Sequence, residues 1–292
     1  MEGLAPIDGW ALLAIIAKAA GYAAALVAMG GPLFVATFRS APEDVLRLAR
    51  MLAATAALVG LAVLVLRFGI RSARISGMGL HGAVDPIMLG LVWDSPLGTG
   101  AIWRGAGTVL ILGVMIRGAL GLVASLTGAL LVAGSFAMVG HSLGDPRSML
   151  AALLVMHLLA LAFWVGALAP LHRAAGQSGS AALLHRFGIV ASGTVATLIL
   201  AGLVFAWLMI GSLGGLFATA YGWTLIAKLV VVTGLLGLGA NNKLRLVPAL
   251  ASGEPAASVR LRRSIRVEAI AVALILLATA TLTSITTPPV NL

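Results

Sequence analysis

Long apolar segments recur along the chain from Trp10 to Ile285, and they are rich in Leu, Ala and Val. Hydrocarbon offers no partners to backbone N–H and C=O groups, so only helices and closed barrels span a bilayer. Barrel strands would alternate apolar and polar residues over about 10 positions. These segments are instead continuously apolar over about 20 residues, which is the length of a transmembrane α-helix. The pattern therefore predicts membrane-spanning helices.

Composition agrees with this interpretation. Of the 292 residues, 61% are hydrophobic and only 10% are charged, whereas an ordinary soluble domain has about 25% charged residues. The chain is therefore expected to form one all-α transmembrane domain over residues 1–292, a polytopic helical bundle of about eight helices. The expected helices cover residues 11–37, 46–67, 98–116, 118–140, 148–170, 187–212, 223–246 and 264–285.

The distribution of Lys and Arg predicts the orientation. Twelve of these residues lie in the first, third, fifth and seventh loops, and four lie on the opposite side, namely Arg67, Arg71, Arg74 and Arg147. Cytoplasmic loops carry the excess of Lys and Arg, so both termini are expected to be periplasmic. The net charge of +10 is thereby explained by loops beside the lipid bilayer, and no nucleic-acid partner is expected.

Two loops are expected to be longer than the others. The outward segment 68–97 has the composition of a lid or of a short interfacial helix over the bundle. It contains Met78, His81 and Asp85, which weakly indicate a metal site. The alternative is that these residues form an interfacial turn. The inward stretch 248–263 is the other sizeable loop.

Histidine and methionine are the remaining soft or borderline metal ligands, because the chain has no cysteine. The fourth predicted helix ends with Met138 and His141, and a separation of three residues places both side chains on one helix face. The fifth carries Met149, Met156 and His157. Imidazole and thioether groups together are a donor set that suits copper, above all Cu(I).

The depth of His157 distinguishes it from the other histidines. If the fifth helix enters the membrane from outside near Arg147, a rise of 1.5 Å per residue puts Met149 about 3 Å and His157 about 15 Å below the surface. An ionisable residue near the bilayer midplane usually faces a bundle interior or a polar path. We therefore expect His157 to be functional, with a hydrogen-bonded packing role as the alternative.

The other candidates also have structural alternatives. Methionine is a common apolar filler, so packing is the more frequent role for each one. A histidine at a helix end, such as His141, also caps the helix or contacts headgroups. Asn242 and Glu268 are expected to form hydrogen bonds between helices, and Arg104 has the aspartates of the 68–97 segment as candidate partners. No nucleophile with its base, phosphate-binding loop or carboxylate pair is recognisable, so the chain is not expected to be an enzyme.

Several short segments recur in an order typical of one family of membrane proteins. They are Gly140-His141, residues 156–159 and 163–171, Arg186-Phe187, Tyr221-Gly222-Trp223 with Lys228, Asn242, Leu246-Val247-Pro248, residues 261–264 with Glu268, and residues 286–289, preceded by Asp85-Pro86 and residues 98–104. With these segments the sequence resembles the copper resistance protein D (CopD/PcoD) family of the bacterial inner membrane. The likeness covers most of the chain and is strongest over 140–290.

The resemblance implies a function in copper transport and homeostasis. It implies passage of copper ions from the periplasm to the cytoplasm, with His141 and His157 as the copper-handling histidines and a separate periplasmic copper chaperone of the C type as a partner. Two alternatives remain at this stage. One is a haem-binding membrane redox protein, since helical bundles hold haem between intramembrane histidines. The other is a membrane partner of the chaperone that moves no metal.

Overall fold

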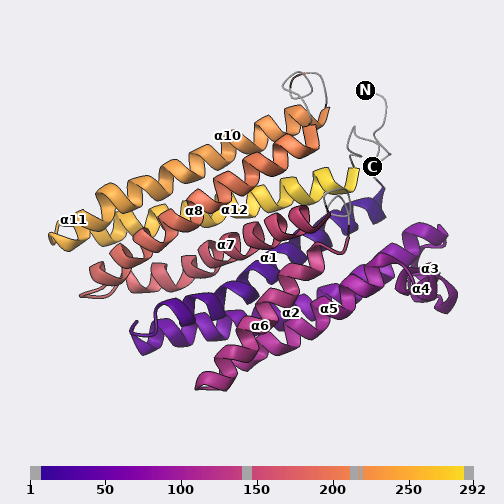
Figure 1. Ribbon diagram of the computed structural model, residues 1–292, viewed down its shortest axis with the longest axis horizontal. Helices are drawn as coiled ribbons and strands as arrows, with labels where there is room; N and C mark the ends of the chain where they lie inside the picture. The colour runs from indigo at the N-terminus through magenta and orange to yellow at the C-terminus, as the bar shows by residue number, and fades with distance from the viewer. Residues whose placement is uncertain (1–7, 140–146, 211–216, 218–219, 286–292) are drawn as a thin grey trace.

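The chain folds into a bundle of long α-helices, shown as a computed structural model in Figure 1. The structure describes residues 8–139, 147–210, 217 and 220–285. The helical elements in chain order are α1 (Gly9–Thr37), α2 (Glu43–Ser76), α3 (Gly79–Val84), α4 (Pro86–Trp93), α5 (Pro96–Ile111), the 3₁₀ turn η1 (Leu112–Met115), α6 (Ala119–Phe136), α7 (Arg147–Ala174), α8 (Ala181–Ile210), α10 (Ala220–Asn241), the π-helical turn η3 (Asn242–Leu246), α11 (Val247–Ala251) and α12 (Ala257–Ile285).

The helices confirm the predicted polytopic bundle. Seven of the described helices are long and apolar enough to cross a membrane: α1, α2, α5 with η1, α6, α7, α8 and α12. The remaining predicted segment, 223–246, corresponds to α10 and η3. With 22 residues, α10 also has the length that a bilayer crossing needs.

Successive long helices run in alternating directions (Figure 1). The start of α1, the end of α12 and the short helices α3 and α4 lie at one end of the bundle, which we name the α3–α4 end. The α1–α2, η1–α6 and α7–α8 connections lie at the opposite end with α11, and we name it the α11 end. Lys18 Nζ of α1 donates a hydrogen bond of 2.8 Å to the Thr283 carbonyl oxygen of α12. The first and last helices therefore begin and end on the same side, as the charge distribution predicts.

Two expectations about helix ends are wrong. α2 continues nine residues past the expected limit of 67 and ends where Gly77 adopts a φ of +68°, so Arg67, Arg71 and Arg74 lie on a helix and not in a loop. The expected loop 248–263 contains α11 and the first turns of α12. Hydropathy marks where a helix leaves the hydrocarbon, whereas the helix itself continues until the backbone meets a residue that stops it.

Glycine allows two central helices to approach closely. A Cβ atom placed on Gly30 of α1 would lie 2.1 Å from the Ala162 carbonyl oxygen of α7, and one on Gly166 would lie 2.5 Å from the Gly30 Cα. Small residues at such crossings let backbones pack directly, which is how membrane helices associate without a hydrophobic driving force. This crossing fixes α7, the helix that carries His157, against α1.

Candidate functional site

The side of α7 that faces the bundle interior carries His157 and Trp164. The two residues are seven apart, which is close to two helical turns, so their side chains lie on one face about 10 Å apart along the axis. The Trp164 side chain is buried, with 7% of its surface exposed, and His157 is half-buried. His157 also lies ten residues, or about 15 Å, from the start of α7 at Arg147. His157 is therefore a half-buried residue on the same face of α7 as the buried Trp164, and its depth in the membrane stays a prediction.

A buried carboxylate follows His157 toward the α11 end. Glu268 of α12 is only 3% exposed. Trp164 Nε1 donates a hydrogen bond to Glu268 Oε2 at 3.2 Å, and Asn242 Nδ2 donates to Glu268 Oε1. The expected hydrogen bond between Asn242 and Glu268 is thus confirmed. We name these three residues the Glu268 cluster, and it joins α7, η3 and α12 at one point.

The backbone at Asn242 is wound as a single π-helical turn. Its carbonyl oxygen accepts the N–H of Val247, five residues on, and the following residue, Pro248, has no N–H with which to continue α-helical bonding. π-turns inside α-helices occur frequently at functional sites. In this turn the buried Asn242 Oδ1 has no hydrogen-bond partner among the residues that the structure describes, so the cluster has a further oxygen acceptor beside its carboxylate.

Five cationic side chains line a cavity at the α3–α4 end. The cavity has a volume of about 420 Å³, and among the described residues its lining includes Lys18, Arg67, Arg71, Arg74 and Arg104 but no Asp or Glu. The three arginines of α2 follow one another at spacings of four and three residues, which places them on one helix face. Coulomb repulsion makes this cavity unfavourable for a bare metal cation.

Arg104 is held by α6 and not by the segment over the bundle. Its Nε donates to Ser135 Oγ at 3.0 Å, and its guanidinium carbon lies 3.8 Å from the centre of the Phe136 ring. The expected pairing of Arg104 with an aspartate of the 68–97 segment is therefore not formed. One of those aspartates, Asp85, caps α4 by accepting the Met88 N–H at 2.9 Å.

The other predicted metal ligands do not gather around His157 in the part of the chain that the structure describes. Met149 and Met156 are 41% and 45% exposed, and their spacing of seven places them together on an outer face of α7. Met78 is 51% exposed, and His81 on α3 is exposed too. Among the described residues, no three His, Cys, Asp or Glu side chains lie close enough to hold a metal ion.

Met138 lies beyond the end of α6, whereas the sequence predicts it at the end of the fourth helix. α6 ends at Phe136, where Ala137 N–H bonds back to the Gly134 carbonyl, and Met138 lies in the turn that follows. His141 lies outside the described residues. A spacing of three residues places two side chains on one face only within a continuous helix, so the spacing argument does not apply to Met138.

Two features of the site were not predicted from the sequence. One is the Trp164–Glu268 hydrogen bond, which joins residues 104 positions apart. The other is the cationic cavity, although the spacing of Arg67, Arg71 and Arg74 already indicates one basic helix face. Its partners Lys18 and Arg104 come from two other helices.

The described helices define a polytopic helical membrane protein with a half-buried histidine on α7 and a buried, hydrogen-bonded carboxylate on α12. Two family models match the chain: Copper resistance protein D-like, N-terminal domain, over residues 7–147, and Copper resistance protein D over residues 181–282. The chain belongs to the copper resistance protein D family.

The matched regions leave residues 148–180 between them. This interval contains most of α7, including His157 and Trp164. No match is found among curated proteins or among solved structures. The assignment to a copper resistance membrane protein therefore rests on the two family models and on the helical bundle, and neither family model covers His157.

Proposed function

We propose that this protein carries copper ions across the bacterial inner membrane, from the periplasm to the cytoplasm. The observation that supports the proposal is the position of His157, which is half-buried and lies ten residues into the membrane-spanning helix α7. A neutral imidazole is a good ligand for both oxidation states of copper, and the surrounding hydrocarbon otherwise excludes the ion. Membership of a copper resistance family supports copper as the proposed transported metal.

The Glu268 cluster extends the proposed path toward the cytoplasm. It lies about 10 Å beyond His157 along α7, and its carboxylate and the free Asn242 Oδ1 are oxygen acceptors inside the bundle. A transport path needs several sites that each hold the ion weakly, because an ion bound in one closed cage is not released. His157 followed by the Glu268 cluster has this stepwise character.

Copper is proposed to approach from the side of α6 and α7. The cationic cavity between α1, α2 and α5 repels a bare cation, whereas the connection from α6 to α7 carries Met138 and His141. The exposed residues Met78, His81, Met149 and Met156 have the donor chemistry for transient contacts at the surface. A separate C-type chaperone is the proposed donor of the ion on this periplasmic side.

Transport is tested with purified protein in sealed lipid vesicles. We expect copper to accumulate inside vesicles that contain the protein, at a rate at least tenfold above vesicles without it. A protein that only anchors a chaperone would give no accumulation. The absorption spectrum of the same preparation addresses the haem alternative, because bound haem gives a Soret band and copper transport does not require one. A Soret band together with no copper uptake would replace this proposal.

The absence of cysteine makes the proposed orientation directly measurable. Single cysteines are introduced by Leu80→Cys on α3 and Ser252→Cys after α11, two exposed positions at opposite ends of the bundle. A maleimide that does not cross membranes is expected to label the first variant in spheroplasts and the second only after the membrane is opened. The reverse labelling pattern would invert the proposed orientation.

A further inference from the structure

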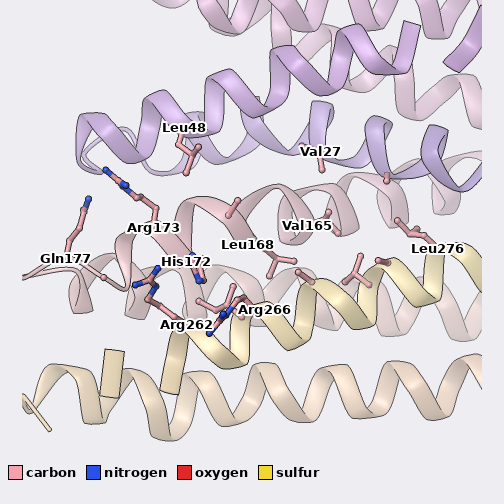
Figure 2. A pocket seen from close by; sticks show the side chains of 17 residues that line it. Val27, Leu48, Val165, Leu168, His172, Arg173, Gln177, Arg262, Arg266 and Leu276 are labelled. Carbon is pink, nitrogen blue, oxygen red and sulfur yellow. The ribbon is translucent and has the colours of Figure 1, made fainter. Parts of the chain in front are cut away.

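A groove between α1, α7 and α12 combines an apolar wall with a basic end (Figure 2). Its volume is about 840 Å³, which is within the range of ligand-binding pockets. His172, Arg173, Gln177, Arg262 and Arg266 gather toward one end in Figure 2, whereas Val27, Val165 and Leu276 lie toward the other. The basic residues lie at the α11 end, where α7 finishes and α12 begins.

The dimensions of the groove match one leaflet of a bilayer. On α12 its lining follows a helical stripe from Arg262 and Arg266 through Ala269, Ala273 and Leu276. Ten residues separate Arg266 from Leu276, a distance of about 15 Å along the helix. Half of a hydrocarbon core of about 30 Å has the same depth. The apolar part therefore has the length of one acyl chain, with the arginines at the level of a headgroup.

The charges at the basic end are only partly balanced. Arg173 Nε pairs with Asp44 Oδ2 at 3.0 Å, and Gln177 donates to the same carboxylate oxygen at 2.6 Å. Arg262 and Arg266 have no ion pair in the part of the chain that the structure describes, and the lining contains no Asp or Glu. Two guanidinium groups and His172 thus face the groove without a protein anion, which complements a phosphate group.

We propose that this groove binds one anionic phospholipid of the cytoplasmic leaflet, with its phosphate at Arg262 and Arg266 and an acyl chain along Ala269 to Leu276. Basic pockets between membrane helices on the cytoplasmic side are a recurring form of lipid recognition. A bound lipid would bridge α1, α7 and α12 beside the Gly30–Gly166 crossing and so support the position of α7. The proposal is independent of copper transport.

The test uses the full-length protein in detergent and measures retention of added lipid by native mass spectrometry. Phosphatidylglycerol is expected to be retained much more strongly than phosphatidylcholine with the same acyl chains. The double variant Arg262→Gln/Arg266→Gln is expected to bind phosphatidylglycerol about 30-fold more weakly, since each basic residue near an anionic lipid contributes about a factor of five. Equal retention of the two lipids by the wild type would overturn the proposal.

Two further variants make the result specific. Arg263→Gln removes one exposed charge from the same turn of α12 but not from the groove lining, so phosphatidylglycerol binding should be unchanged. Ala273→Trp fills the apolar part while both arginines remain, and it is expected to weaken binding at least tenfold. If Ala273→Trp has no effect and inorganic phosphate displaces the lipid, the site recognises a free anion and the lipid assignment is wrong. Elution at the wild-type position in size exclusion confirms that each variant is folded.

Discussion

Cells that express the His157→Ala variant are expected to accumulate no more copper than cells that lack the protein. The imidazole is the proposed ligand at mid-depth, where an uncompensated charge costs about 3 kcal/mol or more. Loss of that much stabilisation corresponds to a rate decrease of about 100-fold. Cell-associated copper is measured by elemental analysis after a timed exposure and is normalised to the amount of protein in the membrane fraction.

Two further substitutions of His157 and one control substitution distinguish a ligand role of this side chain from a packing role. His157→Met supplies a soft thioether and is expected to retain part of the uptake, whereas His157→Gln keeps hydrogen-bonding capacity without a soft donor and should behave like alanine. His185→Ala removes an exposed histidine of α8 and should leave uptake unchanged. Wild-type uptake by His157→Gln would mean that the histidine has a structural role and that copper takes another path.

Sequence hydropathy predicts the order of the long helices well, and seven of the eight expected segments meet the length and hydropathy of a crossing in the described residues, because the bilayer imposes both on each crossing. α1, expected at 11–37, is observed at Gly9–Thr37. Hydropathy predicts the ends of helices poorly wherever a helix extends into water. α12 begins at Ala257, seven residues before the expected start, because Arg260, Arg262 and Arg263 are good helix formers that lower hydropathy without ending a helix.

Counting residues along one helix gives the axial position of a side chain but not its partners. For His157 it gives a distance of about 15 Å from Arg147. The Trp164–Glu268 contact depends on how α7 and α12 rotate against each other, which the sequence of either helix does not specify. The same reason explains Met149 and Met156, which have suitable donor atoms and depth but face outward.

The Glu268 cluster and the peripheral ion pairs of Glu43 and Asp44 stabilise the α11 half of the bundle in different ways. Glu43 pairs with Arg117 at 2.9 Å and Asp44 with Arg173 at 3.0 Å, and both pairs involve exposed arginines, so each contributes little in water. Glu268 is enclosed, and its removal leaves buried donors without an acceptor. We therefore expect the cluster, and not the peripheral ion pairs, to fix the relative positions of α7, η3 and α12.

Replacement of Glu268 by alanine is accordingly expected to destabilise the protein by about 3 to 5 kcal/mol, because the change strands the Trp164 N–H and one Asn242 N–H and leaves a cavity. Thermal unfolding in detergent, followed by tryptophan fluorescence, measures the effect as a lowered midpoint.

Glu254→Ala is the matched control: it removes an exposed ion pair with Arg260, for which about 1 kcal/mol or less is expected. Glu268→Gln keeps the side-chain volume but turns one acceptor into a donor facing another donor, so it should fall between the two. If Glu268→Ala unfolded at the same temperature as Glu254→Ala, the cluster would not hold the three elements together, and the carboxylate would remain only as a step on the proposed copper path.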